Sequence, residues 1–445
     1  MKTIATISTP LVAGAIGIIR MTGDDALRIA ARMFRSKQAE DFTQAQPNRM
    51  YYGTVTAGDV TDKALAVYFR APHSYTGEDL VEFQCHGGVR LMRTVYRACL
   101  DLGAQAADKG EFTKRAFLNG KYALSDCEGI VDLIQGESMA AVRAASRQAQ
   151  GALARRIGEL NDQLLDGIGE LEASLDYPDE MEDEARTNAR QWTERIYDAL
   201  RALRDTAQTG AYIRNGIAVA IVGNPNVGKS SLLNRLLGQD RAIVTDIAGT
   251  TRDTLEASIE VRGILLRLID TAGIRESEDA VERIGVERSK RSARTSDVVL
   301  HMIDASRPAD ESQRALEREL RDTDARLLRV YNKTDLPLAQ DTSDGIALSA
   351  TQGIGIETLR NAIVDAVVTQ AIDPGAEIVT NERHVRALDQ AIASVRAAAD
   401  ALDVQPTECI LLDLRNAYFA LGEITGHTAS EDIVDRIFSK FCLGK

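Results

Sequence analysis

The sequence lacks the features of a secreted or membrane-inserted chain. No apolar run is long enough to span a bilayer, and the N-terminus has no basic stretch, apolar core and small-residue cleavage site of a signal peptide. The five cysteines are scattered without CxxC spacing, which argues against a disulfide framework and a zinc ribbon. These absences predict a reducing, cytoplasmic location without membrane contact.

Positive charge is also scarce. The chain carries 53 Lys and Arg against 66 Asp and Glu, a formal net charge of -13. So acidic a chain is no general binder of phosphate backbones, and any contact with nucleic acid must be local. Residues 1–118 are the exception, with 15 basic and 12 acidic residues, a net of +3 (15 − 12).

Proline is nearly absent from the stretch between Pro72 and Pro225, where Pro178 is the one exception. Leucines and isoleucines there recur at helical spacing, for example at Leu160, Leu164 and Leu171. The pattern predicts long antiparallel helices that break at 176–180. The acidic run 180–184 is expected to be a solvated loop.

The sequence patterns in the rest of the chain predict two further domains. Residues 1–118 alternate short β-like runs with turn signals and one helical stretch, which indicates a small α+β domain. Residues 216–370 alternate strands and helices, which indicates a doubly wound sheet. The expected strands of that sheet are Ile217–Val222, Ser258–Val261, Leu265–Asp270, Val298–Ile303, Leu327–Tyr331 and Ile346–Leu348.

These sequence patterns together predict an α/β domain inserted into a helical domain. The helical domain is made of two pieces, 119–215 and 371–445, and the α+β domain precedes it.

A phosphate-binding motif follows the first of these strands. Gly223–Ser230 matches G-x-x-x-x-G-K-[ST] between an apolar strand and a helix, which is the context that a P-loop requires. Its backbone N–H groups close around the phosphates, Lys229 reaches the β and γ oxygens, and the Ser230 hydroxyl ligates Mg²⁺. The predicted nucleotide contacts here are Asn226, Val227, Gly228, Lys229, Ser230 and Ser231.

The expected base is guanine. Asn332–Asp335 closes a later strand, and the carboxylate of Asp335 can accept from both N1–H and the exocyclic amine of guanine. Adenine offers no donor at these places and would leave the carboxylate unpaired. Ser349 and Ala350, after the next strand, resemble the loop that supports guanine O6. Asn332 and Lys333 complete this set of contacts.

Two further segments are expected to meet the γ-phosphate and its Mg²⁺ ion. Asp270 should hold the ion through water and Gly273 should contact the γ-phosphate, while Thr251 supplies a second hydroxyl ligand. The other contacts predicted in these segments are Thr245, Asp246, Ile247, Ala248, Gly249, Thr250, Thr271 and Ala272.

The residue that follows Gly273 is Ile274, where many small GTPases have a water-orienting glutamine. Isoleucine cannot orient water, so the general base must come from elsewhere in the chain or from a partner. Asn226 offers an amide oxygen beside the phosphates that can ligate a monovalent cation. The alternative is a turn residue after Pro225, where Asn is common.

Together with the terminal run Cys442–Lys445, these motifs resemble the MnmE (TrmE) family of tRNA-modification GTPases. The resemblance covers essentially the whole chain. Leu443 stands where the family commonly has Ile or Val, and Cys85 where Gly is frequent. Four N-terminal stretches also resemble the family: Gly17–Arg20, Tyr75–Asp79, His86–Gly88 and Gly110–Lys121.

The resemblance implies a homodimer formed through the N-terminal domain, which binds a tetrahydrofolate derivative of the 5-formyl or methylene type. It also implies a flavin-dependent partner, MnmG (GidA), with no flavin bound by this chain. The pair would install an aminomethyl or carboxymethylaminomethyl group on C5 of the wobble uridine of certain tRNAs. Two GTPase domains would meet across a bound K⁺ ion in the triphosphate state.

Carried over by residue, the resemblance implies that Glu282 orients the attacking water and that Cys442 serves the modification reaction. The implied K⁺ ligands are Asn226, Thr245, Ile247 and Thr250, and the implied folate-pocket residues are Arg20, Glu82, Lys121 and Lys445. Without the family resemblance, Glu282 and the charged folate-pocket residues would be read as solvated surface, and Cys442 would be read as an inert buried thiol. His86 could be a base or a turn residue.

A second function class stays open at this point. A ribosome-assembly or regulatory GTPase switch, related to the Era and Der families, would share the central domain and do no chemistry of its own. Those proteins lack the terminal Cys-x-Gly-Lys run and the 110–121 motif, and both are present here.

Overall fold

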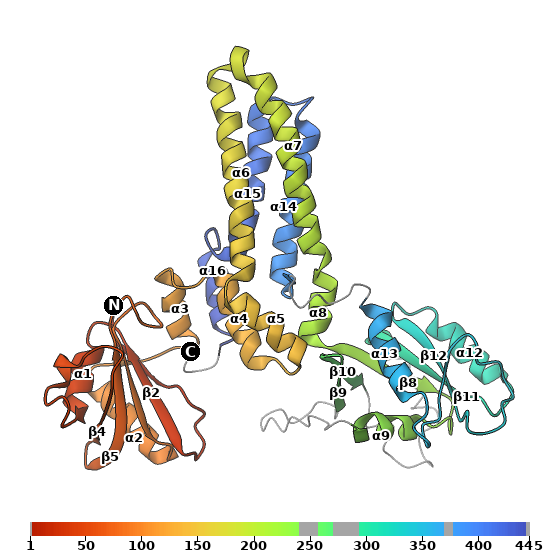
Figure 1. Cartoon of the computed structure of the whole chain (residues 1–445), viewed down its shortest axis with the longest axis horizontal. Coiled ribbons are helices and arrows are strands. Elements are labelled where there is room, and N and C mark those ends of the chain that lie inside the picture. The colour runs from red at the N-terminus through yellow and green to blue at the C-terminus, as the bar shows by residue number, and fades with distance from the viewer. Residues whose placement is uncertain (1, 240–256, 270–292, 369–376, 442–445) are drawn as a thin grey trace. The chain divides into compact units, whose positions relative to one another are not determined.

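The computed structural model describes residues 2–239, 257–269, 293–368 and 377–441. Chain contacts divide the protein into two compact units, each of which is described separately (Figure 1). The first contains residues 1–131, 148–192 and 397–445, and the second contains 132–147 and 193–396. Within the described residues, no helix is both long and apolar enough to cross a bilayer.

A seven-stranded sheet forms the N-terminal domain, in the order β3-β4-β5-β6-β2-β1-β7. All neighbours are antiparallel except β1 and β7, which are parallel. The strands are β1 (Ile4–Ile7), β2 (Ile16–Thr22), β3 (Phe34–Arg35), β4 (Met50–Ala57), β5 (Val60–Phe69), β6 (Leu80–His86) and β7 (Gln105–Ala106). The predicted α+β domain and its β-like runs are confirmed.

Two helices, α1 (Ala26–Met33) and α2 (Val89–Asp101), cover one face of this sheet. Strand side chains alternate between faces, so Ile19 and Met21 of β2 point into the core beneath these helices. Arg20, between them, points from the other face. The sheet therefore has one face covered by α1 and α2. The other face is covered only at its Ile4–Leu80 end, by Phe112 and Tyr75, and is called the open face here.

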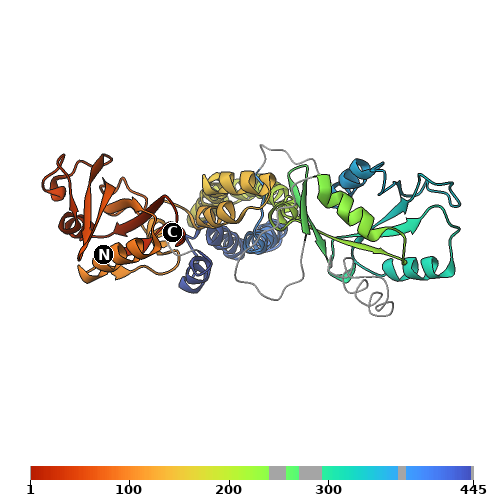
Figure 2. The ribbon, with the colours of Figure 1, turned by 90° about the horizontal axis from the view of Figure 1, so that it is seen from below.

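The helical part of the first unit is built on long amphipathic helices. Helix α6 (Ala152–Asp176) packs along α15 (Thr407–Thr425), and both are seen end-on in Figure 2, in the yellow and blue of the colour bar. Leu160, Leu164 and Leu171 are buried along α6, as their spacing predicts. Segments at least 231 residues apart in sequence (407 − 176) thus pack together, as the two-piece helical domain requires.

The break between α6 and α7 (Pro178–Asp205) lies where the sequence predicts it, but the acidic run 180–184 is not a loop. The prediction of a solvated loop is wrong, because these residues form the first turns of α7. Pro178 occupies the first helical position, where its missing N–H costs nothing. Carboxylates beside a helix N-terminus are stabilised by the helix dipole.

The C-terminal helix α16 (Glu431–Phe438) packs against the start of the helical region in the same unit. Phe438 and Phe441 share a buried cluster with Leu124 of α4 (Leu124–Gln135) and with Phe117 of α3 (Glu111–Leu118). A Cβ on Gly110 would lie 2.8 Å from the Phe438 carbonyl oxygen. The last described residues are therefore held tightly against the 110–121 motif.

The second unit contains a six-stranded sheet, in the order β13-β12-β11-β8-β10-β9, and only β9–β10 is antiparallel. Its strands are β8 (Ile217–Gly223), β9 (Ala257–Val261), β10 (Ile264–Ile269), β11 (Val298–Asp304), β12 (Arg326–Asn332) and β13 (Ile346–Ala347). All six lie where the sequence predicts them. The inserted α/β domain within a helical domain is confirmed.

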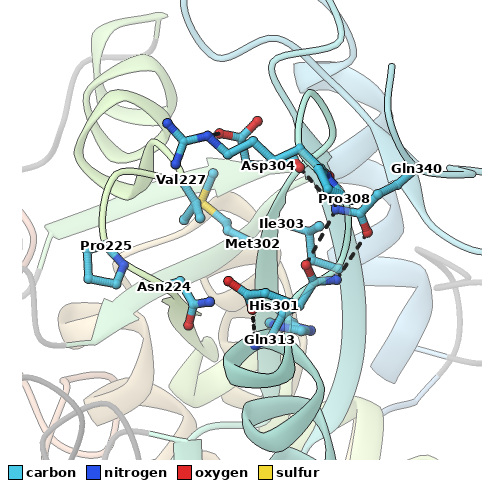
Figure 3. Close-up of a pocket in the computed structure, with 12 residues that line it drawn as sticks. Asn224, Pro225, Val227, His301, Met302, Ile303, Asp304, Pro308, Gln313 and Gln340 are labelled. Atoms are coloured by element: carbon cyan, nitrogen blue, oxygen red, sulfur yellow. Dashed lines mark hydrogen bonds and ion pairs between the residues drawn. The ribbon is translucent and has the colours of Figure 1, made fainter. Parts of the chain in front are cut away.

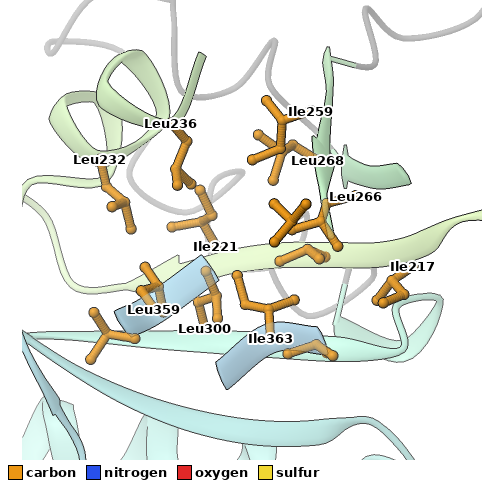
Figure 4. Close-up of a cluster of buried hydrophobic side chains, with 14 of the residues drawn as sticks. Ile217, Ile221, Leu232, Leu236, Ile259, Leu266, Leu268, Leu300, Leu359 and Ile363 are labelled. Carbon is orange, nitrogen blue, oxygen red and sulfur yellow. The ribbon is translucent and has the colours of Figure 1, made fainter. Parts of the chain in front are cut away.

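Helices α9 (Lys229–Gln239) and α13 (Ile356–Val367) close the core of this sheet (Figure 4). Leu232 and Leu236 of α9 lie in one buried cluster with Leu359 and Ile363 of α13, so the two helices cover the same face of the sheet. Other helices whose described residues lie wholly or mostly in this unit are α5 (Met139–Ala149), α8 (Ala207–Asn215), α12 (Glu311–Leu320) and α14 (Glu382–Ala401). The finer boundaries at 118, 215 and 370 stay predictions.

Candidate nucleotide site

The P-loop connects β8 to α9 and has the backbone shape that a phosphate cradle needs. Asn226 has a φ of 59° and Gly228 a φ of 100°, so both lie in the left-handed region. Asn tolerates that region, but a Cβ on Gly228 would lie 2.3 Å from Asn332 Nδ2. Only glycine therefore fits at position 228.

Lys229 begins α9 and points back over the loop. Its ammonium donates to the carbonyl oxygens of Gly223 (2.8 Å) and Asn224 (2.9 Å). Burial lowers the pKa of Lys229 from its ordinary value. A half-buried cation held by two neutral carbonyls is poised to pair with an anion, which is the role predicted for it.

Asn332 joins two of the predicted segments. Its Nδ2 donates to the Val227 carbonyl at 2.7 Å, and its Oδ1 accepts from the Ala350 backbone N–H at 3.0 Å. Ser349, in the same loop as Ala350, is fully buried. A single buried amide thus fixes the P-loop against the loop predicted to support guanine O6.

The predicted base-reading residue, Asp335, lies beyond this junction with an exposed side chain. Lys333, at a φ of 65°, places its Nζ 2.6 Å from Asp304 Oδ2. Burial alone would raise the pKa of Asp304, but hydrogen bonds from Lys333 and Ser306 hold it below its usual value. The carboxylate therefore stays ionised and fixes the strand ends beside the nucleotide site.

Arg235 is a contributor that sequence reasoning missed. It projects from α9, and its Nε donates to the Ala350 carbonyl at 3.0 Å, while its guanidinium also bonds the Thr351 carbonyl. It therefore anchors the loop that is predicted to support guanine to the helix that follows the P-loop. Arginine is common in helices, and nothing in the local sequence marks this one.

A polar cavity of about 90 Å³ lies beside the P-loop (Figure 3). Asn224 and Pro225 line one side, and His301 and Asp304 of β11 line another. His301 is 1% exposed, its Nδ1 has no partner among the described residues, and burial lowers its pKa. The imidazole is therefore neutral near pH 7, and the cavity is large enough to hold ordered water.

The predicted folate residues begin with an ion pair on the open face of the N-terminal sheet. Arg20 of β2 and Glu82 of β6 are directly paired across the strands, and Arg20 Nε lies 2.6 Å from Glu82 Oε1. The guanidinium carbon also lies 6.0 Å from the centroid of the Tyr75 ring. The structure thus brings two of the four predicted folate residues together, next to an aromatic ring.

Lys121 reaches the same loop from α3's end. Its Nζ donates to the Pro72 carbonyl at 3.1 Å, and Asn119 Nδ2 donates to the Thr76 carbonyl at 2.7 Å. Tyr75 and Thr113 share a hydrogen bond of 2.9 Å between their hydroxyls. The Tyr75–Asp79 and Gly110–Lys121 motifs therefore form one structure.

Arg115 holds that structure together from within. It is 7% exposed, and its guanidinium pairs with Glu78 (3.0 Å) and Glu111 (2.8 Å) and donates to the Lys2 carbonyl. A buried, multiply bonded guanidinium has a structural role, because removing it would leave two carboxylates without their partner.

His86 is held by a carboxylate. Its Nδ1 lies 2.6 Å from Asp62 Oδ1, and its backbone N–H donates to the other oxygen of Asp62. A Cβ on Gly87 would lie 2.5 Å from the Gly14 carbonyl oxygen, so a glycine is required there. Cys85 is buried, and burial raises the pKa of its thiol to about 12, so the thiol is unreactive.

Several predicted site residues lie outside the described part of the chain. They are Thr245, Asp246, Ile247, Ala248, Gly249, Thr250, Thr251, Asp270, Thr271, Ala272, Gly273, Glu282, Cys442 and Lys445. Their predicted roles stay predictions.

Comparison with known proteins matches both ends of the chain to one family. A model of the GTP-binding protein TrmE N-terminus matches residues 3–121, and a model of the MnmE helical domain matches residues 124–442. The second match alone covers more than half of the chain. A solved structure of the FeoB G-domain from Methanococcus jannaschii is 27% identical over 34% of this chain and 97% of its own, with a TM-score of 0.26.

Full-length relatives agree with the family models. A curated tRNA modification GTPase MnmE from Geobacillus thermodenitrificans is 40% identical, with 100% of this chain and 99% of the relative covered. The corresponding protein from Acetivibrio thermocellus is 41% identical at the same coverage. The chain therefore belongs to the MnmE family of tRNA modification GTPases.

Proposed function

We propose that this chain is a K⁺-stimulated, Mg²⁺-dependent GTP hydrolase that works with an MnmG (GidA) flavoprotein. The pair modifies C5 of the wobble uridine of certain tRNAs with a one-carbon unit from a folate. The observation that carries the nucleotide part is the Asn332 junction, which ties the phosphate loop to the guanine-supporting loop. Such a junction serves a nucleotide that spans both loops.

The described residues suit the proposed ions. Mg²⁺ prefers hard oxygen ligands, and Ser230 supplies a hydroxyl at the start of α9. Asn226, in its left-handed conformation, offers an amide oxygen of the kind that K⁺ accepts. The other proposed ligands, Thr251 and Asp270 for Mg²⁺ and the 245–250 loop for K⁺, lie outside the described residues. The ions would neutralise charge that develops on the phosphates.

The open sheet face suits a folate. The flat 2-amino-4-oxo ring of a tetrahydrofolate donates hydrogen bonds that a carboxylate such as Glu82 accepts. Its own carboxylates suit Arg20 and Lys121, and Tyr75 supplies an aromatic surface. Lys445 and Cys442 are proposed to complete this site from the C-terminal end, since Phe441 already packs against the adjoining motif.

The same face carries large apolar side chains that support the proposed homodimer. Met50 lies in the row of Arg20 and Glu82, and Tyr52 lies in the next row. Met50 and Tyr52 are 49% and 60% exposed. Exposed apolar side chains gathered on an open sheet face are typical of an interaction surface.

Potassium dependence tests the catalytic part. We expect GTP hydrolysis by the pure protein to be at least about tenfold faster in KCl than in NaCl at equal ionic strength, because a coordinated K⁺ supplies transition-state charge. The Asn226→Ala variant should lose this difference. Equal rates in both salts would remove the potassium mechanism and leave an activating protein as the source of positive charge.

Wobble-uridine analysis tests the modification part. We expect the modified uridine to disappear from the tRNA of a strain whose only copy carries Cys442→Ser, while the purified variant keeps normal GTP hydrolysis. Nucleoside analysis by mass spectrometry measures the first and a phosphate-release assay the second. Intact modification in that strain would contradict the role of Cys442 and favour a switch without chemistry of its own.

A further inference from the structure

Two helices of the N-terminal domain carry an arginine-rich outer surface. Helices α1 and α2 bury Ile29, Met33, Met92 and Val95 against the helix-covered face of the sheet. Their outward residues include five exposed arginines and one carboxylate, Asp101, and a second carboxylate, Asp25 at the start of α1, pairs with Arg28 at 2.9 Å. We call this set the arginine face: Arg28, Arg32, Arg90, Arg93 and Arg97. Counted with Asp25 and Asp101, this surface has a net charge of +3 (5 − 2), in a chain whose net charge is -13.

The arginines of α2 are not neutralised. Arg90, Arg93 and Arg97 follow at i, i+3 and i+7 and form no ion pair with any described carboxylate, whereas many exposed arginines elsewhere do. Around α12, for example, Arg318 pairs with Glu311, and Arg321, the residue after the helix, pairs with Glu317. Three unpaired guanidiniums on one helical stripe form a local cationic patch, which an acidic chain needs for contact with a polyanion.

We propose that the arginine face binds the phosphate backbone of tRNA; this inference rests on the proposed function for the identity of the RNA. Guanidinium groups form bidentate hydrogen bonds with phosphates, and at a rise of 1.5 Å per residue Arg90 and Arg97 lie about 10 Å apart along α2. Such contacts position an RNA without reading its sequence. Base recognition therefore lies elsewhere.

The location of this surface fits the rest of the domain. The arginine face lies on the helix-covered side of the sheet, whereas Arg20 and Glu82 project from the open side. An RNA bound over α2 would therefore compete neither with a ligand at the ion pair nor with a partner on Met50 and Tyr52. The two faces can be occupied together.

The test is tRNA binding by the full chain with Arg90→Gln, Arg93→Gln and Arg97→Gln combined, measured against unmodified tRNA between 50 and 200 mM KCl. We expect the affinity at low salt to fall at least about tenfold. The slope of log affinity against log salt should flatten by about two to three, since each lost phosphate contact removes about 0.7 to 0.9. GTP hydrolysis and the melting temperature should stay at the wild-type values.

The matched control is Arg314→Gln, Arg318→Gln and Arg321→Gln, which removes three exposed arginines around α12 and should keep the wild-type slope. A wild-type slope in the α2 variant would overturn the proposal. So would equal losses in both variants, or no tRNA binding by the wild-type chain at 50 mM KCl. Loss of binding to anionic vesicles or to the flavoprotein, with tRNA binding intact, would equally overturn it.

The inference and the proposed function can fail separately. If wobble uridines are modified normally without this chain, the proposed function falls, but a flattened slope in the α2 variant would still establish an RNA surface. If modification needs the chain and the α2 variant binds tRNA normally, the arginine face is excluded and the proposed function stands.

Discussion

Replacing Gly228 by alanine should weaken GTP binding by about 10²-fold. The added Cβ would lie 2.3 Å from Asn332 Nδ2, and the backbone at φ 100° is strained for any L-residue. Strain of this kind costs about 1–3 kcal/mol, and displacing the Asn332 bond to Val227 costs a further ~1–3 kcal/mol. A combined loss near ~3 kcal/mol corresponds to about two powers of ten in affinity.

Titration with a fluorescent guanine nucleotide measures this effect, and a thermal melt shows whether the variant is folded. Gly238→Ala is the matched control, because no atom lies within 4 Å of a Cβ built on Gly238. It should bind nucleotide normally and melt slightly higher, since alanine favours helix. Wild-type affinity in the Gly228 variant would show that the P-loop does not depend on the Asn332 junction.

Replacing Glu282 by alanine should slow GTP hydrolysis by about 10²-fold or more and leave GTP affinity nearly unchanged. A positioned acid–base group contributes on this scale to the chemical step, and a residue that orients water does little for ground-state binding. The prediction comes from Ile274, which cannot orient water, and from the family resemblance. Glu282 itself lies outside the described residues.

Single-turnover hydrolysis measures the chemical step, and nucleotide titration measures binding. Glu287→Ala, in the same charged segment, is the control and should hydrolyse GTP at the wild-type rate. A Glu282 variant with weaker binding and normal turnover would show a structural role for this carboxylate. The general base would then have to come from the second protomer or the flavoprotein.

Much of the fold could be predicted because its signals are local. The strands of the α/β domain are short apolar runs bounded by turns, and the P-loop motif fixes the strand before it and the helix after it. The two-piece helical domain followed from the helical pattern on both sides of the α/β domain, whereas the packing of α6 on α15 was not predicted. The helical conformation of the acidic run 180–184 could not be predicted, because carboxylates occur both in loops and in the first turn of a helix.

The site was harder to predict where it depends on contacts distant in sequence. Asn332 was expected to read the base region, but its hydrogen bond to Val227 spans 105 residues. The bond from Arg235 to Ala350 spans 115 residues and has no sequence signature. The cavity beside His301 depends on how β11 packs next to the P-loop. The spacing of motifs in a single sequence identifies which residue types form the site, but it does not show which distant residues contact each other.

The contact between α16 and α3 also sets an order of events during protein synthesis. Lys114 pairs with Asp435, which is 321 residues later in the sequence, and Phe117 contacts Phe438, at the same separation. At a translation rate of 5–20 residues per second, the 110–121 motif emerges roughly 15 to 60 s before its partner exists. Over that interval nascent chains expose Phe117 and Leu124 to solvent, so a chaperone that holds apolar segments should crosslink to stalled chains truncated before residue 430 and release full-length ones.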